Sequence, residues 1–266
     1  MIGVSQFRGL MAQRQVLRTL VERDLRVRYA GSVLGYVWTV LDPLLMALVY
    51  FVVFTLIFTA RQTGNQPYFL HLITGLFLWQ WFASNMSESS RALLSESRLV
   101  RSANLPRELW VVRVVLAKGI EFVLTLPVVV AFTIFYLITG DTKLHWTIIF
   151  IPVALVLTFL LSVGIGMILA PITVLVTDMA RVVRIALRLG FYATPVLYSA
   201  DMAPDTLRTV LALNPMSGIL ELFRSGFFKG EMNLFSVASA CVLTVVLLLV
   251  GAFVFKRLEP AVLKEI

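Results

Sequence analysis

The chain has 266 residues, of which 59% are hydrophobic and only 14% are charged, and its mean hydropathy is +0.89. Soluble domains are closer to about 45–50% apolar and about 25% charged, so this composition excludes an ordinary soluble enzyme and predicts a multi-pass membrane protein. The net charge of +8 comes from basic residues in blocks between apolar runs, which is the pattern of cytosolic loops rather than of a nucleic-acid-binding protein.

The first predicted element is an amphipathic helix over residues 10–28 that lies in the membrane interface. Its apolar and charged positions fall on separate faces. These positions are Leu17, Leu20, Val21 and Leu25 on one face, and Arg14, Arg18, Glu22 and Arg26 on the other. Such a helix brings its arginines close to anionic lipid headgroups. It is either a surface helix without a specific role or a docking element for a partner protein, and the pattern leaves both interpretations open.

Six apolar segments that follow are predicted to cross the roughly 30 Å hydrocarbon core as helices. They are residues 35–59, 69–86, 120–139, 146–176, 185–198 and 234–255. With both termini in the cytosol, the inner side holds 18 of the 23 Lys and Arg residues. The positive-inside rule therefore predicts six spans with cytosolic N and C termini.

Residues 199–233, before the last span, are too polar for a lipid-facing helix and too apolar for a free loop. Two short helices broken at Asn214-Pro215 fit this composition. Non-helical backbone at membrane depth is tolerated only where it packs against protein or lines a cavity. We therefore expect a re-entrant helical hairpin over about residues 203–230.

Asp42 is an acid inside the first predicted span, which makes it a functional candidate. The sequence Asp42-Pro43 also has the form of a helix N-cap followed by proline in the first turn, and we favour this structural role. Glu121, at the cytosolic edge of the third span, is the other acid of this kind. In the fourth span, Ser162, Gly166 and Ala170 form a stripe of small residues that permits close helix packing.

No enzymatic or metal-binding pattern occurs in the sequence. His71 and His145 have no Cys, His or carboxylate partner at metal-ligand spacing, and a single cysteine, Cys241, excludes an intrachain disulfide. The nucleotide-binding pattern GxxxxGK[ST] is missing as well. We expect no catalytic residue, metal or cofactor in this chain, so any nucleotide that powers it binds another chain.

Aromatic residues in the first, second and fifth spans are candidates for a substrate pathway, because aromatic rings stack on the CH faces of sugars. The candidates are Tyr36, Trp38, Tyr50, Phe54, Trp79, Trp81, Tyr192 and Tyr198. The alternative is interfacial belts and lipid-facing rings. Arg181, Arg184 and Arg188 share one helix face, where they either reach anionic lipid or receive a diphosphate headgroup from the cytosol.

Three segments carry a resemblance to a known family. They are residues 23–45, which begin RDLRVRYAGSVLGYVW and continue to Asp42-Pro43-Leu44-Leu45, the loop 99–109 with Pro106, and LNPMSGILELFR at 213–224. Together they resemble ABC-2 type permeases that export polysaccharides such as O-antigen, capsule, teichoic acid and galactan. The family often has Asn before the proline, where this chain has Asp42.

The resemblance implies that residues 1–266 form a single ABC-2 type transmembrane domain in a bacterial plasma membrane. Two copies would pair with two nucleotide-binding subunits, which hold ATP and Mg. The cargo would be a polyprenyl-diphosphate-linked polysaccharide, with galactan favoured over O-antigen and teichoic acid. A permease for a drug or another lipid, or a membrane-embedded glycan enzyme, remains the alternative. The family's interface helix corresponds to about residues 10–28, and its gate and coupling segment to about 88–108.

Within residues 88–108 we expect a helix that receives force from the ATPase. Leu93, Leu94, Leu99 and Val100 would enter a groove of the partner, and Arg98 and Arg101 would face its acidic rim. Pro106 would end this helix and fix the turn into the third span. The predicted coupling residues are Leu94, Arg98, Leu99, Arg101 and Pro106.

Overall fold

The computed structural model describes residues 13–54, 67–102, 105–230 and 232–266, and within these ranges the secondary structure is helical without strands. The longer helices are α2 (Arg14–Tyr29), α3 (Val37–Val52), α4 (Tyr68–Ser89), α7 (Glu108–Val123), α8 (Leu126–Thr139), α9 (Ile151–Leu175), α10 (Met179–Ala193) and α13 (Leu234–Glu265). The shorter ones are α5 (Ala92–Ser95), α6 (Ser97–Ser102), α11 (Asp205–Ala212) and α12 (Pro215–Arg224). The predicted all-α class is confirmed.

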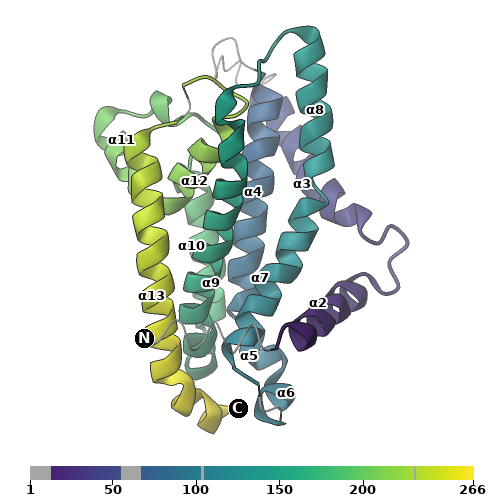
Figure 1. Cartoon of the computed structure of the whole chain (residues 1–266), viewed down its shortest axis with the longest axis vertical. Coiled ribbons are helices and arrows are strands. Elements are labelled where there is room, and N and C mark those ends of the chain that lie inside the picture. The colour runs from purple at the N-terminus through teal and green to yellow at the C-terminus, as the bar shows by residue number, and fades with distance from the viewer. Residues whose placement is uncertain (1–12, 55–66, 103–104, 231) are drawn as a thin grey trace.

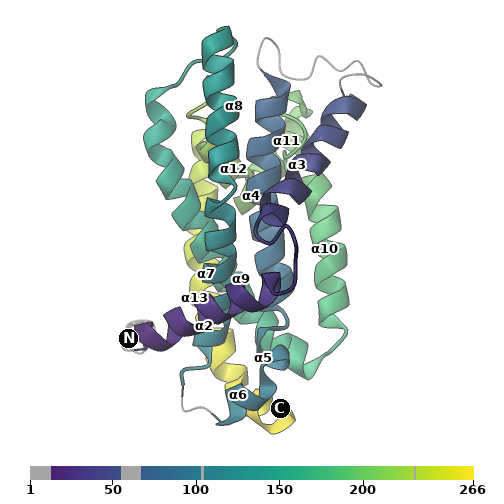
Figure 2. The same cartoon turned by 90° about the vertical axis from the view of Figure 1, so that its right-hand side faces the viewer.

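The longer helices other than α2 form an elongated bundle (Figure 1). Helices α5 and α6 and the C-terminal end of α13 lie at one end of the bundle, and α11 lies near the opposite end (Figure 1). Helix α2 runs across the long helices near the end that holds α5 and α6 (Figure 2). The amphipathic N-terminal segment is thus placed beside the segment predicted to couple to an ATPase.

Three helical stretches within the described ranges are long and apolar enough to cross a membrane: 108–139, 146–175 and 234–265. Helix α3 is apolar but shorter. Helices α3, α4 and α10 overlap the predicted first, second and fifth spans, and α10 begins six residues earlier than predicted. Sixteen of the 22 residues of α4 are buried, because its aromatic and aliphatic residues cover most of the circumference and its neighbours surround it.

Helix α7, at the start of the predicted third span, begins at Glu108, earlier than the predicted start at Ile120. Its first turns carry Arg113 and Lys118, whose charges indicated a loop. Both side chains are instead buried and ion-paired, which removes the cost of placing them in a packed helix. The prediction for this boundary was wrong because three of the four pairing partners, Asp24, Glu88 and Glu96, lie far away in the sequence.

The N-cap role favoured for Asp42 is also wrong. Helix α3 begins at Val37, and Pro43 lies inside it. Gly35, with φ of 50°, occupies the left-handed region just before the helix, so the chain turns there and not at Asp42. Asp42 therefore faces a groove that is described below.

The small-residue stripe on α9 does permit close packing. Asn85 of α4 donates a hydrogen bond of 3.0 Å to the Ser162 hydroxyl. A Cβ added to Gly166 would lie 2.8 Å from Val111 Cγ1 of α7. On the other side of α9, a Cβ at Gly251 of α13 would lie 2.2 Å from the Gly164 carbonyl oxygen. These contacts hold α9 against three neighbours at once.

The segment before α13 is broken as predicted. Helix α11 ends at Ala212, and Asn214 caps α12 by accepting a hydrogen bond from the Met216 amide at 3.0 Å. Arg224, which the predicted topology places on the outer side, is buried in the protein. Its guanidinium donates hydrogen bonds to the carbonyls of His71, Pro195 and Val196 at 2.6–2.9 Å. Arg224 therefore ties α12 to α4 and to the segment after α10.

Candidate functional site

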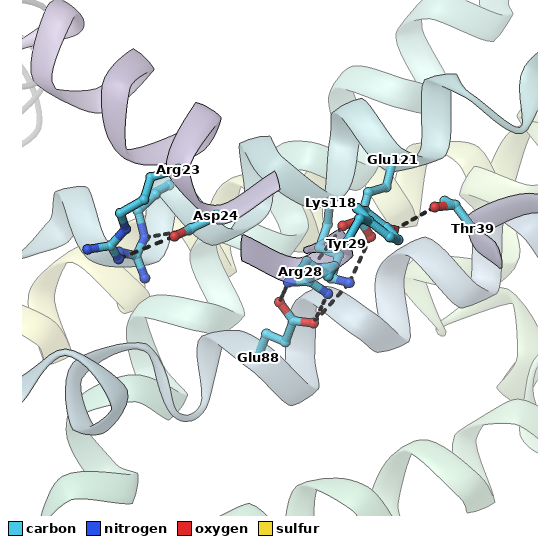
Figure 3. Close-up of polar contacts among 9 residues, drawn as sticks. Arg23, Asp24, Arg28, Tyr29, Thr39, Glu88, Lys118 and Glu121 are labelled. Carbon is cyan, nitrogen blue, oxygen red and sulfur yellow. Dashed lines mark hydrogen bonds and ion pairs between the residues drawn. The ribbon is translucent and has the colours of Figure 1, made fainter. Parts of the chain in front are cut away.

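Four charged residues from α2, α4 and α7 form a closed ring of alternating charge, here called the first charge ring (Figure 3). Arg28 pairs with Glu88 at 2.5 Å and with Glu121 at 3.0 Å. Lys118 pairs with the same two carboxylates at 2.9 and 2.8 Å. Glu121 is thus not a lone membrane acid, because two cations neutralise it.

A second charge ring lies one turn away along α2. Arg23 pairs with Asp24 at 3.3 Å and with Glu96, which lies between α5 and α6. Arg113 pairs with Asp24 at 3.0 Å and with Glu96 at 3.4 Å. Arg113 is buried, and its guanidinium also lies 5.1 Å from the centre of the Trp110 ring.

The two rings fasten α2 to α7 and to the segment that runs from the end of α4 through α6. Burial acts to raise the pKa of Glu88, but the hydrogen bonds and charges of Arg28 and Lys118 outweigh it and lower that pKa. The pairing with Glu88 likewise raises the pKa of Arg28. A further link joins α2 to α3, because the Tyr29 and Thr39 hydroxyls are 2.6 Å apart (Figure 3). These contacts connect the ends of four helices.

The second charge ring, together with Arg28 and Glu88 of the first, lines a cavity of about 760 Å³, here called the arginine cleft. Its wall is completed by Arg91, in the turn between α4 and α5, and by Arg184 of α10. A second cavity of about 880 Å³, the aromatic groove, lies between α3, α4 and α10. The two cavities share Ser87, Glu88 and Arg184, so they adjoin where α4 ends beside α10.

The aromatic groove collects part of the aromatic set that the sequence singled out. Tyr50, Trp79 and Tyr192 line it, together with Phe191. The Phe191 ring lies 5.9 Å from that of Tyr50 and 6.0 Å from that of Trp79, which brings α3, α4 and α10 together. The groove therefore has aromatic walls in addition to apolar ones.

The other aromatic candidates lie elsewhere. Tyr36 contacts Tyr29, and Trp38 is exposed. Trp81 stacks on Phe122 of α7, on another side of α4. The remaining two are Phe54, which neighbours Tyr50, and Tyr198, whose hydroxyl donates to the Tyr192 carbonyl.

The three arginines of α10 separate in the structure. Arg184 lines both cavities, Arg188 lines the aromatic groove alone, and Arg181 lines neither. All three side chains are exposed. Of these three arginines of α10, Arg184 and Arg188 are positioned to meet a molecule bound in the cavities, and Arg181 is not.

The coupling segment is not one helix, because α4, α5 and α6 are separated by turns at Ser90-Arg91 and at Glu96. Leu93 and Val100 are buried in the chain's own core, so their predicted insertion into a partner is wrong. Leu94, Arg98, Leu99 and Arg101 are exposed at the end of the bundle. Pro106 follows α6, and its carbonyl accepts from the Leu109 amide at the start of α7.

Sequence reasoning missed the charge rings and the buried position of Arg224. One local signal was present, because Lys118 and Glu121 have the i, i+3 spacing of an ion pair on a helix. The partners on α2 and α4 had no such signal. No group of three or more His, Cys, Asp or Glu residues placed to hold a metal occurs within the described part of the chain.

Comparison with known proteins identifies the family. A family model described as ABC-2 type transporter matches residues 15–228. The chain is 32% identical over 244 residues to the O-antigen export system permease protein RfbA of Klebsiella pneumoniae, covering 92% of each protein. It is 31% identical over 227 residues to RfbA of Myxococcus xanthus, covering 85% of each. It is 24% identical to the polysialic acid transport protein KpsM of Escherichia coli, over 96% of this chain and 98% of that protein. The chain belongs to the ABC-2 type transporter family.

Proposed function

We propose that this chain is the permease subunit of an exporter that moves a polyprenyl-diphosphate-linked polysaccharide from the cytosolic to the outer side of the plasma membrane. The observation that carries this proposal is the junction of the arginine cleft with the aromatic groove. A lipid-linked glycan needs a cationic surface for its diphosphate, apolar surface for its prenyl chain and aromatic surface for its sugars. All three kinds of surface adjoin at Ser87, Glu88 and Arg184.

The relatives support a polysaccharide cargo, because two carry O-antigen export in their names and a third carries polysialic acid transport. Within this class we favour galactan, with O-antigen and teichoic acid precursors as alternatives. Tyr50, Trp79 and Tyr192 would contact the cargo, and Arg184 with Arg188 would receive its headgroup.

In the proposed assembly, two copies of the chain bind two ATPase subunits that hold ATP and Mg. The six predicted spans cross the membrane, α2 lies in its cytosolic interface, and α11 with α12 forms the re-entrant hairpin. Both termini are then cytosolic. Leu94, Arg98, Leu99 and Arg101 would contact the ATPase, because they are exposed on α5 and α6 at the end of the bundle that carries the charge rings.

A second candidate is export of another lipid or of a drug, because Leu45, Met46 and Leu187 give the groove apolar walls that suit a simple hydrophobic cargo. The aromatic cluster and the relatives favour the glycan.

Depletion of the protein in its own organism tests the proposal. Lipid-linked glycan should accumulate on the cytosolic side and surface glycan should fall, and the wild-type gene should restore both. Normal surface glycan after complete loss would reject the proposal. The cargo is then identified by the ATPase activity of the purified complex with defined precursors. Stimulation by O-antigen or teichoic acid precursors, but not by galactan precursors, would overturn the choice of galactan.

A further inference from the structure

The arginine cleft contains two cations whose charge is not neutralised within the described part of the chain. Five arginines and three acids line the cleft. Three of those arginines belong to the charge rings, where Asp24, Glu88 and Glu96 pair with them. The remaining two, Arg91 and Arg184, form no ion pair with any residue that the structure describes.

Arg91 and Arg184 come from different elements. Arg91 lies in the turn that follows α4, and Arg184 lies in the second turn of α10. Both side chains are exposed and both line the same cleft. A guanidinium presents a planar set of donors that matches phosphate oxygens, and two such groups on one cleft can share a single phosphorylated headgroup.

Glu88, the acid next to these two arginines in the cleft, does not repel a bound anion. Glu88 borders both cavities, but Arg28 and Lys118 contact its carboxylate at 2.5 and 2.9 Å. The first charge ring therefore neutralises Glu88 and leaves the positive charge of Arg91 and Arg184 dominant. Arg184 also borders the aromatic groove, where Met46 and Leu187 provide apolar surface.

We propose that Arg91 and Arg184 form a subsite for the phosphorylated headgroup of an amphiphile whose apolar chain lies in the aromatic groove. This inference rests on the proposed function, and it specifies two residues of the entrance. Arg91 is new to the site, and Arg181 is excluded from it, since it lines neither cavity. The subsite selects ligands by the charge of their headgroup, while the groove binds the apolar chain of the ligand whatever that charge is.

The test uses the complete complex with its ATPase in phosphatidylcholine nanodiscs, with empty nanodiscs as the reference. The probes are farnesyl diphosphate, farnesol and inorganic pyrophosphate, and their affinities are measured by titration calorimetry. The wild type should bind farnesyl diphosphate at least about ten-fold more tightly than either other probe. The double variant R91Q/R184Q should lose most of the preference for the diphosphate over the alcohol, and each single variant should lose part of it.

The matched control is R26Q/R181Q, which removes two exposed arginines from α2 and α10 outside both cavities, and it should keep the preference. Melting temperature and co-purification with the ATPase establish that each variant is assembled. An unchanged preference in assembled R91Q/R184Q would overturn the subsite. Pyrophosphate binding as tightly as farnesyl diphosphate would also overturn it, because the site would then serve a free anion. Either result would remove this subsite and leave glycan export itself to be decided by depletion, which tests the proposed function separately.

Discussion

Arg28 of α2 and Glu88 at the end of α4 form a two-pronged ion pair, with nitrogen–oxygen distances of 2.6 and 2.5 Å. The two residues are 60 positions apart in sequence. Glu88 directly precedes the turns that lead into α5 and α6. Together with the pairs of Glu96, this ion pair links the segment that carries α5 and α6 to α2 and α7 through side-chain contacts in addition to the backbone.

The first prediction concerns this ion pair. Arg28→Gln should lower stability by about 1–3 kcal/mol, between the values for exposed and buried pairs, because Glu88 and Glu121 would then share only Lys118. Thermal melting of the purified complex measures this. Arg26→Gln is the matched control, since Arg26 is exposed on the same helix outside both rings. Equal melting temperatures for the two variants would contradict a stabilising role of the ring.

The second prediction concerns pH. Arg28 and Lys118 hold the pKa of Glu88 below its ordinary value of 4.5 in the folded protein. A carboxyl group with a lowered folded-state pKa stabilises the protein above its unfolded pKa and loses this effect as pH falls through the folded value. The difference in melting temperature between wild type and Glu88→Gln should thus stay constant from about pH 8 to about pH 5 and shrink at lower pH. A difference that already disappears near neutral pH would show that Glu88 is not held ionised.

The third prediction concerns Arg224. Arg224→Met should destabilise the protein by about 3 kcal/mol or more, because three buried carbonyls lose their donor and each costs roughly 1–3 kcal/mol. Arg224→Lys should recover only part of this, since an ammonium cannot reproduce the planar arrangement of donors. Lys229→Gln, an exposed change close in sequence, should have little effect. The melting temperatures of the three variants measure this, and equal values for Arg224→Met and Lys229→Gln would contradict the role of Arg224.

The fourth prediction concerns coupling. The double charge reversal R98E/R101E should abolish export and leave membrane insertion intact, because both side chains are exposed on α6 and neither supports the core. Single Ala changes should do little, since exposed ion pairs contribute about 0–1 kcal/mol each. Surface glycan and membrane content are the measurements, and K256E/R257E on α13 is the control. Normal export by an assembled R98E/R101E variant would move the coupling site, most naturally to α2.

The fifth prediction concerns topology. With Cys241 replaced by Ser, single cysteines at Gly64, Asp141 and Lys229 should react with an impermeant reagent from outside the cell. A cysteine at Arg101 should be protected until the membrane is opened. Protection of all three outer positions would overturn six spans with cytosolic termini.

Local pattern was sufficient for part of the structure. The separate faces of α2, the break at Asn214 and the small-residue stripe of α9 follow from spacing along one helix or from one capping residue. Such features depend on neighbours three or four positions away, which are visible in a single sequence. The same holds for the segments that resemble the family, because they are contiguous.

The functional arrangement depended on contacts between distant segments. Nothing local to Arg113 shows that Asp24 of α2 pairs with it, and nothing local to Lys118 shows that Glu88 of α4 does, and so the start of α7 was misplaced. Arg224 reaches the His71 carbonyl across 153 positions, and its burial was missed for the same reason.

Composition and helical periodicity by themselves determined that this is a helical membrane protein with an amphipathic N-terminal helix. Only the tertiary structure decided which aromatic residues share a groove and which arginines keep an unneutralised charge. The physical reason is that charge neutralisation and shared cavities are properties of through-space neighbours, and α2, α4, α7 and α10 become neighbours only in the folded bundle.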